Sequence, residues 1–118
     1  MYVQGFLVAV PQDKKEAYRE VAEKAATKFI EYGVIEIVES WEEDVTDGKV
    51  TDFRMATKAQ PDEKIVFSWM IWPDKATCDA ASEKMQDDPF WSQDFDMPFD
   101  GKRMIWGGFT PIFTSGRE

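Results

Sequence analysis

Three segments of the chain carry apolar residues at both odd and even positions, a pattern typical of strands buried on both faces. They are residues 2–10, 65–72 and 103–113. Pro11 ends the first, and Pro111 in the third is compatible only with an edge strand or a strand end. A fourth segment, about 34–45, alternates apolar and acidic residues, which predicts a strand with one polar face.

Two segments repeat apolar residues at spacings of three and four and therefore predict amphipathic helices. The first follows Asp13, interpreted as an N-cap with Glu16 three positions on, and stops at Gly33 with a positive φ. The second opens at Asp74 as its N-cap and ends before Pro89. The inward stripe of the first helix is Tyr18, Val21, Ala22, Ala25, Phe29 and Ile30, and that of the second is Cys78, Ala81 and Met85.

The less regular segments are a short helix between Thr51 and Ala59 and an aromatic, acidic loop over 90–99. Strand–helix–strand thus occurs twice, the βαββαβ order of the α+β ferredoxin-like fold with an antiparallel sheet. Two helices cover one face of such a sheet, yet three strands are apolar on both sides. Because an apolar edge strand left open invites aggregation, we expect a second copy to cover the remaining face as a homodimer.

Three stretches resemble the bacterial YbaA-like family, the domain of unknown function 1428. They are Met1-Tyr-Val-Gln-Gly-Phe6, Lys64-Ile-Val-Phe-Ser-Trp69 and the run from Met97 through Asp100-Gly101-Lys102-Arg103 to Phe109. The resemblance covers nearly the whole chain and implies a single domain over 1–118. It also implies a dimeric α+β barrel, the superfamily to which that family is assigned, and no assigned reaction.

Composition narrows the possible chemistry. The 118 residues have a net charge of −9, which argues against binding a nucleic-acid backbone. No apolar run is long enough to span a membrane and no secretory leader opens the chain, so we expect a cytoplasmic protein. There is no histidine, which removes the usual general base and imidazole metal ligands, and Cys78 has no cysteine partner. We therefore expect no metal and no cofactor; the acidic run from Glu39 to Asp47 lacks the spacing of a calcium loop.

Seven residues are candidates for binding a ligand, each with a competing structural interpretation. The tryptophans suggest an aromatic pocket between sheet and helices, although core and interface packing is the favoured role. An arginine could hold a carboxylate, with a structural ion pair favoured, and Ser68 could position an indole N–H. Gly107-Gly108 is interpreted as a strand bulge in preference to a close approach by a ligand. The candidates are Trp41, Arg54, Ser68, Trp69, Asp100, Arg103 and Trp106.

Three hypotheses about function follow. The leading one is a homodimer that binds a small apolar or aromatic molecule in a tryptophan-lined pocket. The second is a cofactor-independent monooxygenase, implied by other members of the superfamily, in which a dry pocket orients a substrate that itself reacts with oxygen. The third is a purely structural or interaction protein. The sequence does not decide whether any reaction is catalysed.

Overall fold

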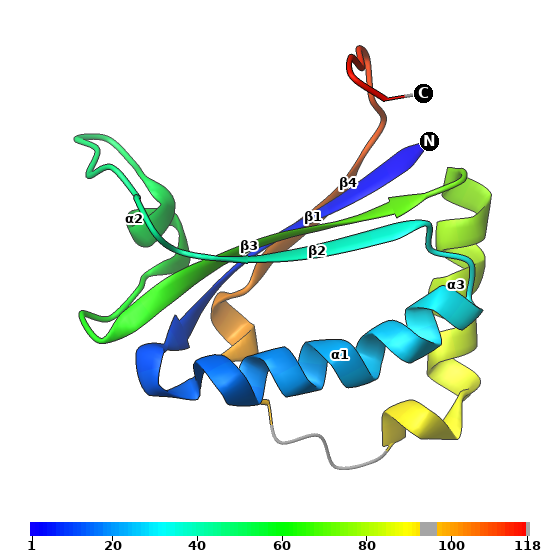
Figure 1. Cartoon of the computed structure of the whole chain (residues 1–118), viewed down its shortest axis with the longest axis horizontal. Coiled ribbons are helices and arrows are strands. Elements are labelled where there is room, and N and C mark those ends of the chain that lie inside the picture. The colour runs from blue at the N-terminus through cyan, green and yellow to red at the C-terminus, as the bar shows by residue number, and fades with distance from the viewer. Residues whose placement is uncertain (93–96, 118) are drawn as a thin grey trace.

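The computed structural model describes residues 1–92 and 97–117, and within them four antiparallel strands form one sheet in the order β2-β3-β1-β4 (Figure 1). The two central strands pair along their whole length, with Tyr2 opposite Trp72 and Pro11 opposite Glu63. This strand order and the antiparallel pairing agree with the predicted ferredoxin-like arrangement. The strands are β1 (Tyr2–Pro11), β2 (Glu36–Trp41), β3 (Glu63–Trp72) and β4 (Ile105–Phe109).

Two long helices, α1 (Lys15–Glu31) and α3 (Lys75–Asp87), lie on the same side of the sheet, as Figure 1 shows. The short helix predicted between residues 51 and 59 is α2 (Phe53–Thr57), and it lies on the opposite side. One-turn 3-10 helices, η1 (Gln12–Lys14), η2 (Pro89–Ser92) and η3 (Gly101–Arg103), complete the connections. Part of the loop predicted over 90–99 lies outside the described residues.

Two of the three helix ends predicted from the sequence are confirmed, and the third is wrong. Asp74 caps α3 by accepting a hydrogen bond of 2.7 Å from the Thr77 N–H. Gly33 follows α1 with a φ of 109°, as predicted. Asp13 is not an N-cap, because the chain first makes the 3-10 turn η1 and α1 begins after Lys14 with no side-chain cap.

Two strands are shorter than predicted, and the paired glycines do not form a bulge. β2 ends at Trp41 and β4 at Phe109, so Pro111 lies beyond the edge strand β4. Gly107 and Gly108 pair one to one with Gly5 and Gln4 in an uninterrupted register. Gly108 instead leaves room for the Tyr2 side chain, because a Cβ there would lie 1.8 Å from the Tyr2 hydroxyl.

The core on the helix side is divided into two clusters. The cluster near α3 contains buried Trp72 and Cys78, the latter packed as a small apolar residue as predicted. The other, near the start of α1, contains Val8, Val10 and Val66. Helix α1 itself has no fully buried residue, and Ile30, expected in its inward stripe, is 65% exposed. The space between the two clusters is therefore incompletely filled.

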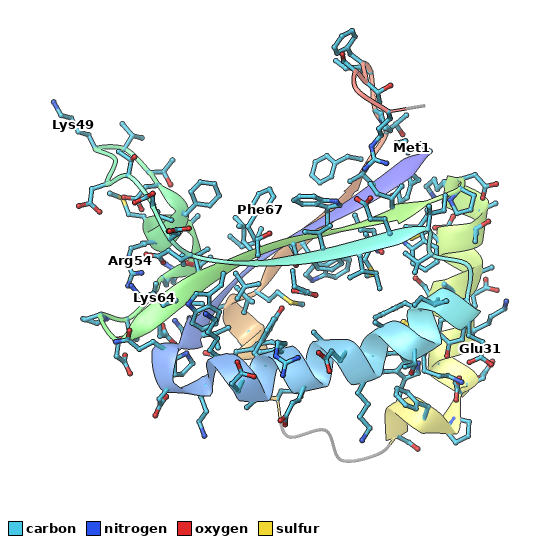
Figure 2. All side chains as sticks on the ribbon, viewed as in Figure 1. Met1, Glu31, Lys49, Arg54, Lys64 and Phe67 are labelled. Carbon is cyan, nitrogen blue, oxygen red and sulfur yellow. The ribbon has the colours of Figure 1, made fainter. Side chains whose placement is uncertain are left out.

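The opposite face of the sheet is apolar and open in the single chain. Phe67 projects from this face, away from α1 (Figure 2), and is 45% exposed. Phe109 from the edge strand is 62% exposed. The segment after β4, termed the C-terminal arm here (residues 110–117), rises from the same side and carries Ile112 and Phe113, both almost fully exposed. A hollow of about 670 Å³ lies between this arm and the sheet.

Candidate functional site

A cavity of about 340 Å³ lies between the sheet and the helices, at the gap between the two core clusters. We call it the inner cavity. Nearly all its lining is apolar, contributed by β1, α1, β2, β3, α3 and the segment after α3. The polar side chains among its described lining residues are Tyr18, Glu39 and Ser68; the apolar side chains include Phe6, Ala25, Phe29, Met70, Trp91 and Met104.

The three polar groups converge from three elements. Glu39 is on β2, on the side of Ile37 and Trp41 that faces the helices, and Ser68 is opposite it on β3. The Tyr18 hydroxyl, from the first turns of α1, donates a hydrogen bond of 2.7 Å to Glu39 Oε1. Ser68 is 4% exposed, and its hydroxyl hydrogen-bonds within the same cluster. A carboxylate and two hydroxyls therefore meet in otherwise apolar surroundings.

Among the carboxyl groups of the described residues with a resolved shift, Glu39 is the one whose pKa is raised. Loss of hydration raises its pKa, and this effect outweighs the opposing hydrogen bonds from Tyr18 and Ser68. Burial is also the main cause that raises the pKa of Tyr18, followed by the nearby charge of Glu39. Each of the other carboxyl groups with a resolved shift in the described residues has a lowered pKa; they are Glu36, Asp52, Glu63, Asp74, Asp88 and Asp100.

A second cavity of about 340 Å³ lies between α1 and β2 and shares four lining residues with the first: Tyr18, Ala22, Ile37 and Glu39. Glu39 thus borders both cavities and its side chain is exposed to solvent, although nearby protein atoms displace part of its hydration. Of these two cavities, the outer one alone has cations among its described lining residues. Arg19 is paired with Glu16 and Glu23, and Lys15 Nζ lies 5.6 Å from the centre of the Trp41 ring.

Three of the candidates from the sequence meet at the other end of the sheet, around Glu63. Arg103 donates two hydrogen bonds of 2.8 Å to the Glu63 carboxylate and one of 3.1 Å to Asp100. Asp100 also accepts from the Lys102 N–H, which caps η3. Arg54 pairs with Glu42 at 3.0 Å and donates to the Glu63 carbonyl. These groups hold α2, β3 and η3 together, and none of them lines the inner cavity.

The tryptophans are not gathered in one pocket. Trp91 and Trp69 line the inner cavity, Trp41 lines the outer one, and Trp106 is 66% exposed on the edge strand. Trp69 also lines the open-face hollow, and its indole N–H donates to Glu36 at 2.9 Å, so Ser68 is not its partner. Trp72 is a core residue whose indole donates to Gln4. Of the seven candidates, Ser68 and Trp41 have side chains that border the cavities on the helix side, whereas the Trp69 side chain is on the open face beside Phe67.

The sequence reasoning missed Tyr18 and Glu39 as a pair. Tyr18 was assigned only to the apolar stripe of a helix, and Glu39 only to a run of acidic residues. The available signal was that Glu39 shares its strand face with Ile37 and Trp41, and a carboxylate at an apolar-facing position is uncommon without a partner. Among residues 1–92 and 97–117, no group of three or more metal-binding side chains is found, and no helix is long and apolar enough to cross a membrane.

Comparison with known proteins decides the family. The model of the family described as "Protein of unknown function (DUF1428)" matches residues 1–101. The chain belongs to this family. It is 60% identical over 112 residues to "Uncharacterized protein YbaA" of Escherichia coli strain K12, across 94% of this chain and 96% of that relative. Proteins of the same name from Escherichia coli O157:H7 and Shigella flexneri match with the same identity and coverage.

The DUF1428 match includes the polar residues of the inner cavity but not the edge strand or the C-terminal arm. The inner-cavity residues Tyr18, Glu39 and Ser68 lie within the matched part, residues 1–101. Arg103, the edge strand β4 and the C-terminal arm lie beyond it. Apart from Met104, the described lining residues of the inner cavity therefore lie within the matched part of the chain.

Proposed function

We propose that this protein is a homodimer that binds a small apolar or aromatic molecule in the inner cavity. The observation that carries the proposal is the incomplete packing beneath α1. A 17-residue amphipathic helix that covers a sheet ordinarily buries its apolar stripe, yet α1 has no fully buried residue. A volume of about 340 Å³ falls in the lower range of small-molecule sites, whose walls are mostly apolar with a few polar groups.

Trp91 makes binding measurable by tryptophan emission, because it lines the cavity. We expect phenethyl alcohol, a small neutral aromatic, to shift or quench this emission with saturation. Ala25→Phe places a ring inside the cavity and should abolish the response without loss of stability, since filling a void adds contacts. Ala80→Phe, at an exposed position of α3, is the matched control and should respond like the native chain. Absence of a saturable response in the native chain, or equal responses in both variants, would refute ligand binding at this cavity.

The dimer is supported by the open sheet face. Its exposed apolar side chains come from β3, β4 and the C-terminal arm, including Phe67, Phe109 and Phe113. The hollow beneath the arm is lined almost entirely by apolar residues, with Arg117 as its charged member among the described residues. With a net charge of −9 per chain, two copies repel each other unless they meet at an uncharged surface, and this face is such a surface.

A second copy is the occupant that fits this face best. An arm that leaves its own sheet with Ile112 and Phe113 uncovered can pack on a partner, and two-fold symmetry makes the exchange reciprocal. Sheet-to-sheet contact of this kind forms the dimeric α+β barrel. A permanent interface of this type buries upwards of roughly 2,000 Å² in total.

Sedimentation equilibrium tests the dimer directly. The native chain of 13.6 kDa should sediment as a dimer at micromolar concentration. Phe113→Asp, on the arm, should weaken association at least tenfold, because burying an unpaired charge in an apolar interface is costly. Ile30→Asp, which introduces the same charge at an exposed apolar residue of α1, should leave the dimer intact. A folded native monomer would overturn the proposed dimer, as would equal effects of the two substitutions.

A further inference from the structure

The Glu39 cluster has acceptor capacity that the protein itself does not use. An ionised carboxylate offers about four lone-pair positions for hydrogen bonds. Tyr18 and Ser68 are the side chains that hydrogen-bond to it in the described structure. Both are neutral donors and supply no positive charge, and the solvent-exposed carboxylate is hydrated when no ligand is bound. The remaining positions are available to a group that enters through either cavity bordered by Glu39.

The charges around Glu39 do not supply a counter-ion. Among the described residues that line the inner cavity, Glu39 is the only one with a formally charged side chain. Helix α1 faces Glu39 with Tyr18 at the inner cavity and with Lys15, Arg19 and Glu23 at the outer one. Arg19 is bound by Glu16 and Glu23, while Lys15 lies over the Trp41 ring. From β3, the facing group is the neutral hydroxyl of Ser68.

We infer that the molecule bound in the inner cavity is an amine: an apolar or aromatic body of modest size whose ammonium group pairs with Glu39. The apolar walls formed by residues such as Phe29 and Met70 receive the body, and the Glu39 carboxylate receives the positively charged head. A charge-assisted hydrogen bond in a cavity of this kind is about twice as strong as a neutral one. This inference rests on the proposed function, because it specifies the ligand of the same cavity.

A carboxylate ligand fits the site poorly for the same reason. Its charge would face the Glu39 carboxylate across the cavity, and the two negative charges would repel each other. A neutral alcohol can donate one hydrogen bond to Glu39 but leaves the charge uncompensated. The expected order of affinity is therefore amine, then alcohol, then carboxylate.

Three probes that share one body test this order by calorimetry: phenethylamine, phenethyl alcohol and 3-phenylpropionate. At pH 7.5 we expect phenethylamine to bind at least tenfold more tightly than the alcohol, and 3-phenylpropionate to bind most weakly. Glu39→Gln keeps the size and the acceptor for Tyr18 but removes the charge, so it should lower amine affinity tenfold or more. The same variant should change alcohol affinity by less than about threefold. Glu43→Gln, at an exposed position just beyond β2, is the matched control and should leave both affinities unchanged.

The outcomes separate this inference from the proposed function. Binding of all three probes with similar affinity, or equal amine affinity in the native chain and Glu39→Gln, overturns the amine inference and leaves the cavity as a binding site. No binding of any probe overturns both. Alcohol binding by Glu39→Gln also shows that this variant is folded.

The pH dependence of amine affinity provides a second test. Protonation of Glu39 removes the charge that holds the ammonium group, so affinity should fall as the pH is lowered. Because burial raises the pKa of Glu39, this fall should begin at a higher pH than an ordinary glutamate of pKa about 4.3 would give. In Glu39→Gln the amine affinity should not vary with pH over that range. An equal pH dependence in both proteins would overturn the assignment to Glu39.

Discussion

The ion pair between Arg103 and Glu63 allows a quantitative test of how η3 is held to β3. Glu63 begins β3 and is 5% exposed. Its carboxylate accepts two hydrogen bonds of 2.8 Å from Arg103 and one of 2.6 Å from the Gln60 N–H. Arg103→Met keeps the aliphatic stem of the side chain but removes every guanidinium bond, including that of 2.8 Å to the Lys58 carbonyl.

The expected loss in the free energy of unfolding follows from the burial of the Arg103–Glu63 pair. Removing one partner of a fully buried ion pair costs about 3–5 kcal/mol, because the other charge is left without compensation. The Arg103 side chain is 20% exposed, so water can partly hydrate Glu63 in the variant, and the expected loss falls to about 2–4 kcal/mol. The second partner, Asp100, is 47% exposed and contributes little, because exposed pairs are weak.

Chemical denaturation at pH 7 measures this loss. The double variant Arg103→Met/Glu63→Gln removes the stranded charge and should recover at least half of the stability lost in Arg103→Met. Lys102→Met removes the neighbouring cation, which is exposed, and should leave stability nearly unchanged. The reasoning fails if Arg103→Met lies within about 0.5 kcal/mol of the native chain, a change typical of ordinary surface positions.

The sign of the pH dependence gives a further check. The hydrogen bonds from Arg103 are the main cause that lowers the pKa of Glu63 in the folded chain. A lowered carboxyl pKa stabilises the fold above the unfolded-state pKa of about 4.3, and this contribution is lost as the pH falls through the folded-state pKa. The stability difference between native and Arg103→Met should therefore be full at pH 7 and shrink below about pH 4. A difference that stays constant to acid pH would contradict the pairing.

Two further substitutions test the packing. Gly108→Ala should lower the free energy of unfolding by about 1–3 kcal/mol, because its Cβ would lie 1.8 Å from the Tyr2 hydroxyl. Combined with Tyr2→Ala, it should cost less than the sum of the two single changes, and strict additivity would contradict the contact. Trp72→Ala should lower the free energy of unfolding by about 3–5 kcal/mol, since Trp72 is 1% exposed and its indole donates to Gln4 at 2.8 Å; an unchanged unfolding midpoint would show that the residue is not in the core.

Much of the fold could be predicted because its signals are local or periodic. The apolar alternations located β1 and β3, and Asp74 and Gly33 marked helix ends through hydrogen bonding and backbone conformation that the residue types themselves favour. Asp13 failed as a cap because Pro11 leads the chain into a 3-10 turn first. The predicted bulge at Gly107-Gly108 is wrong because Gly108 instead leaves room for the Tyr2 side chain of the neighbouring strand β1, whose position depends on the sheet register.

The candidate site was harder to predict because its partners are distant in sequence. Arg103 bonds to Asp100, three residues away, but its more buried partner Glu63 lies 40 residues earlier, at the start of β3. Tyr18 and Glu39 are 21 residues apart and meet only when α1 crosses β2. Pairs of this kind require the packing of helix on sheet, which periodicity alone does not supply.

The environments of the carboxyl groups distinguish those that stabilise the fold from the one that we propose binds a ligand. Asp74 caps a helix, Asp88 is held by Lys28 and Tyr32, and Glu63 is held by Arg103; in each case hydrogen bonds stabilise the charge and lower the pKa, that of Asp88 to about 2. Glu39 differs because loss of hydration outweighs its hydrogen bonds. A group that only stabilised the fold would gain from a cation or more N–H donors, and Glu39 has neither among its described contacts. In a chain without histidine, such a carboxyl group beside a cavity is the natural place for a ligand to supply the missing charge.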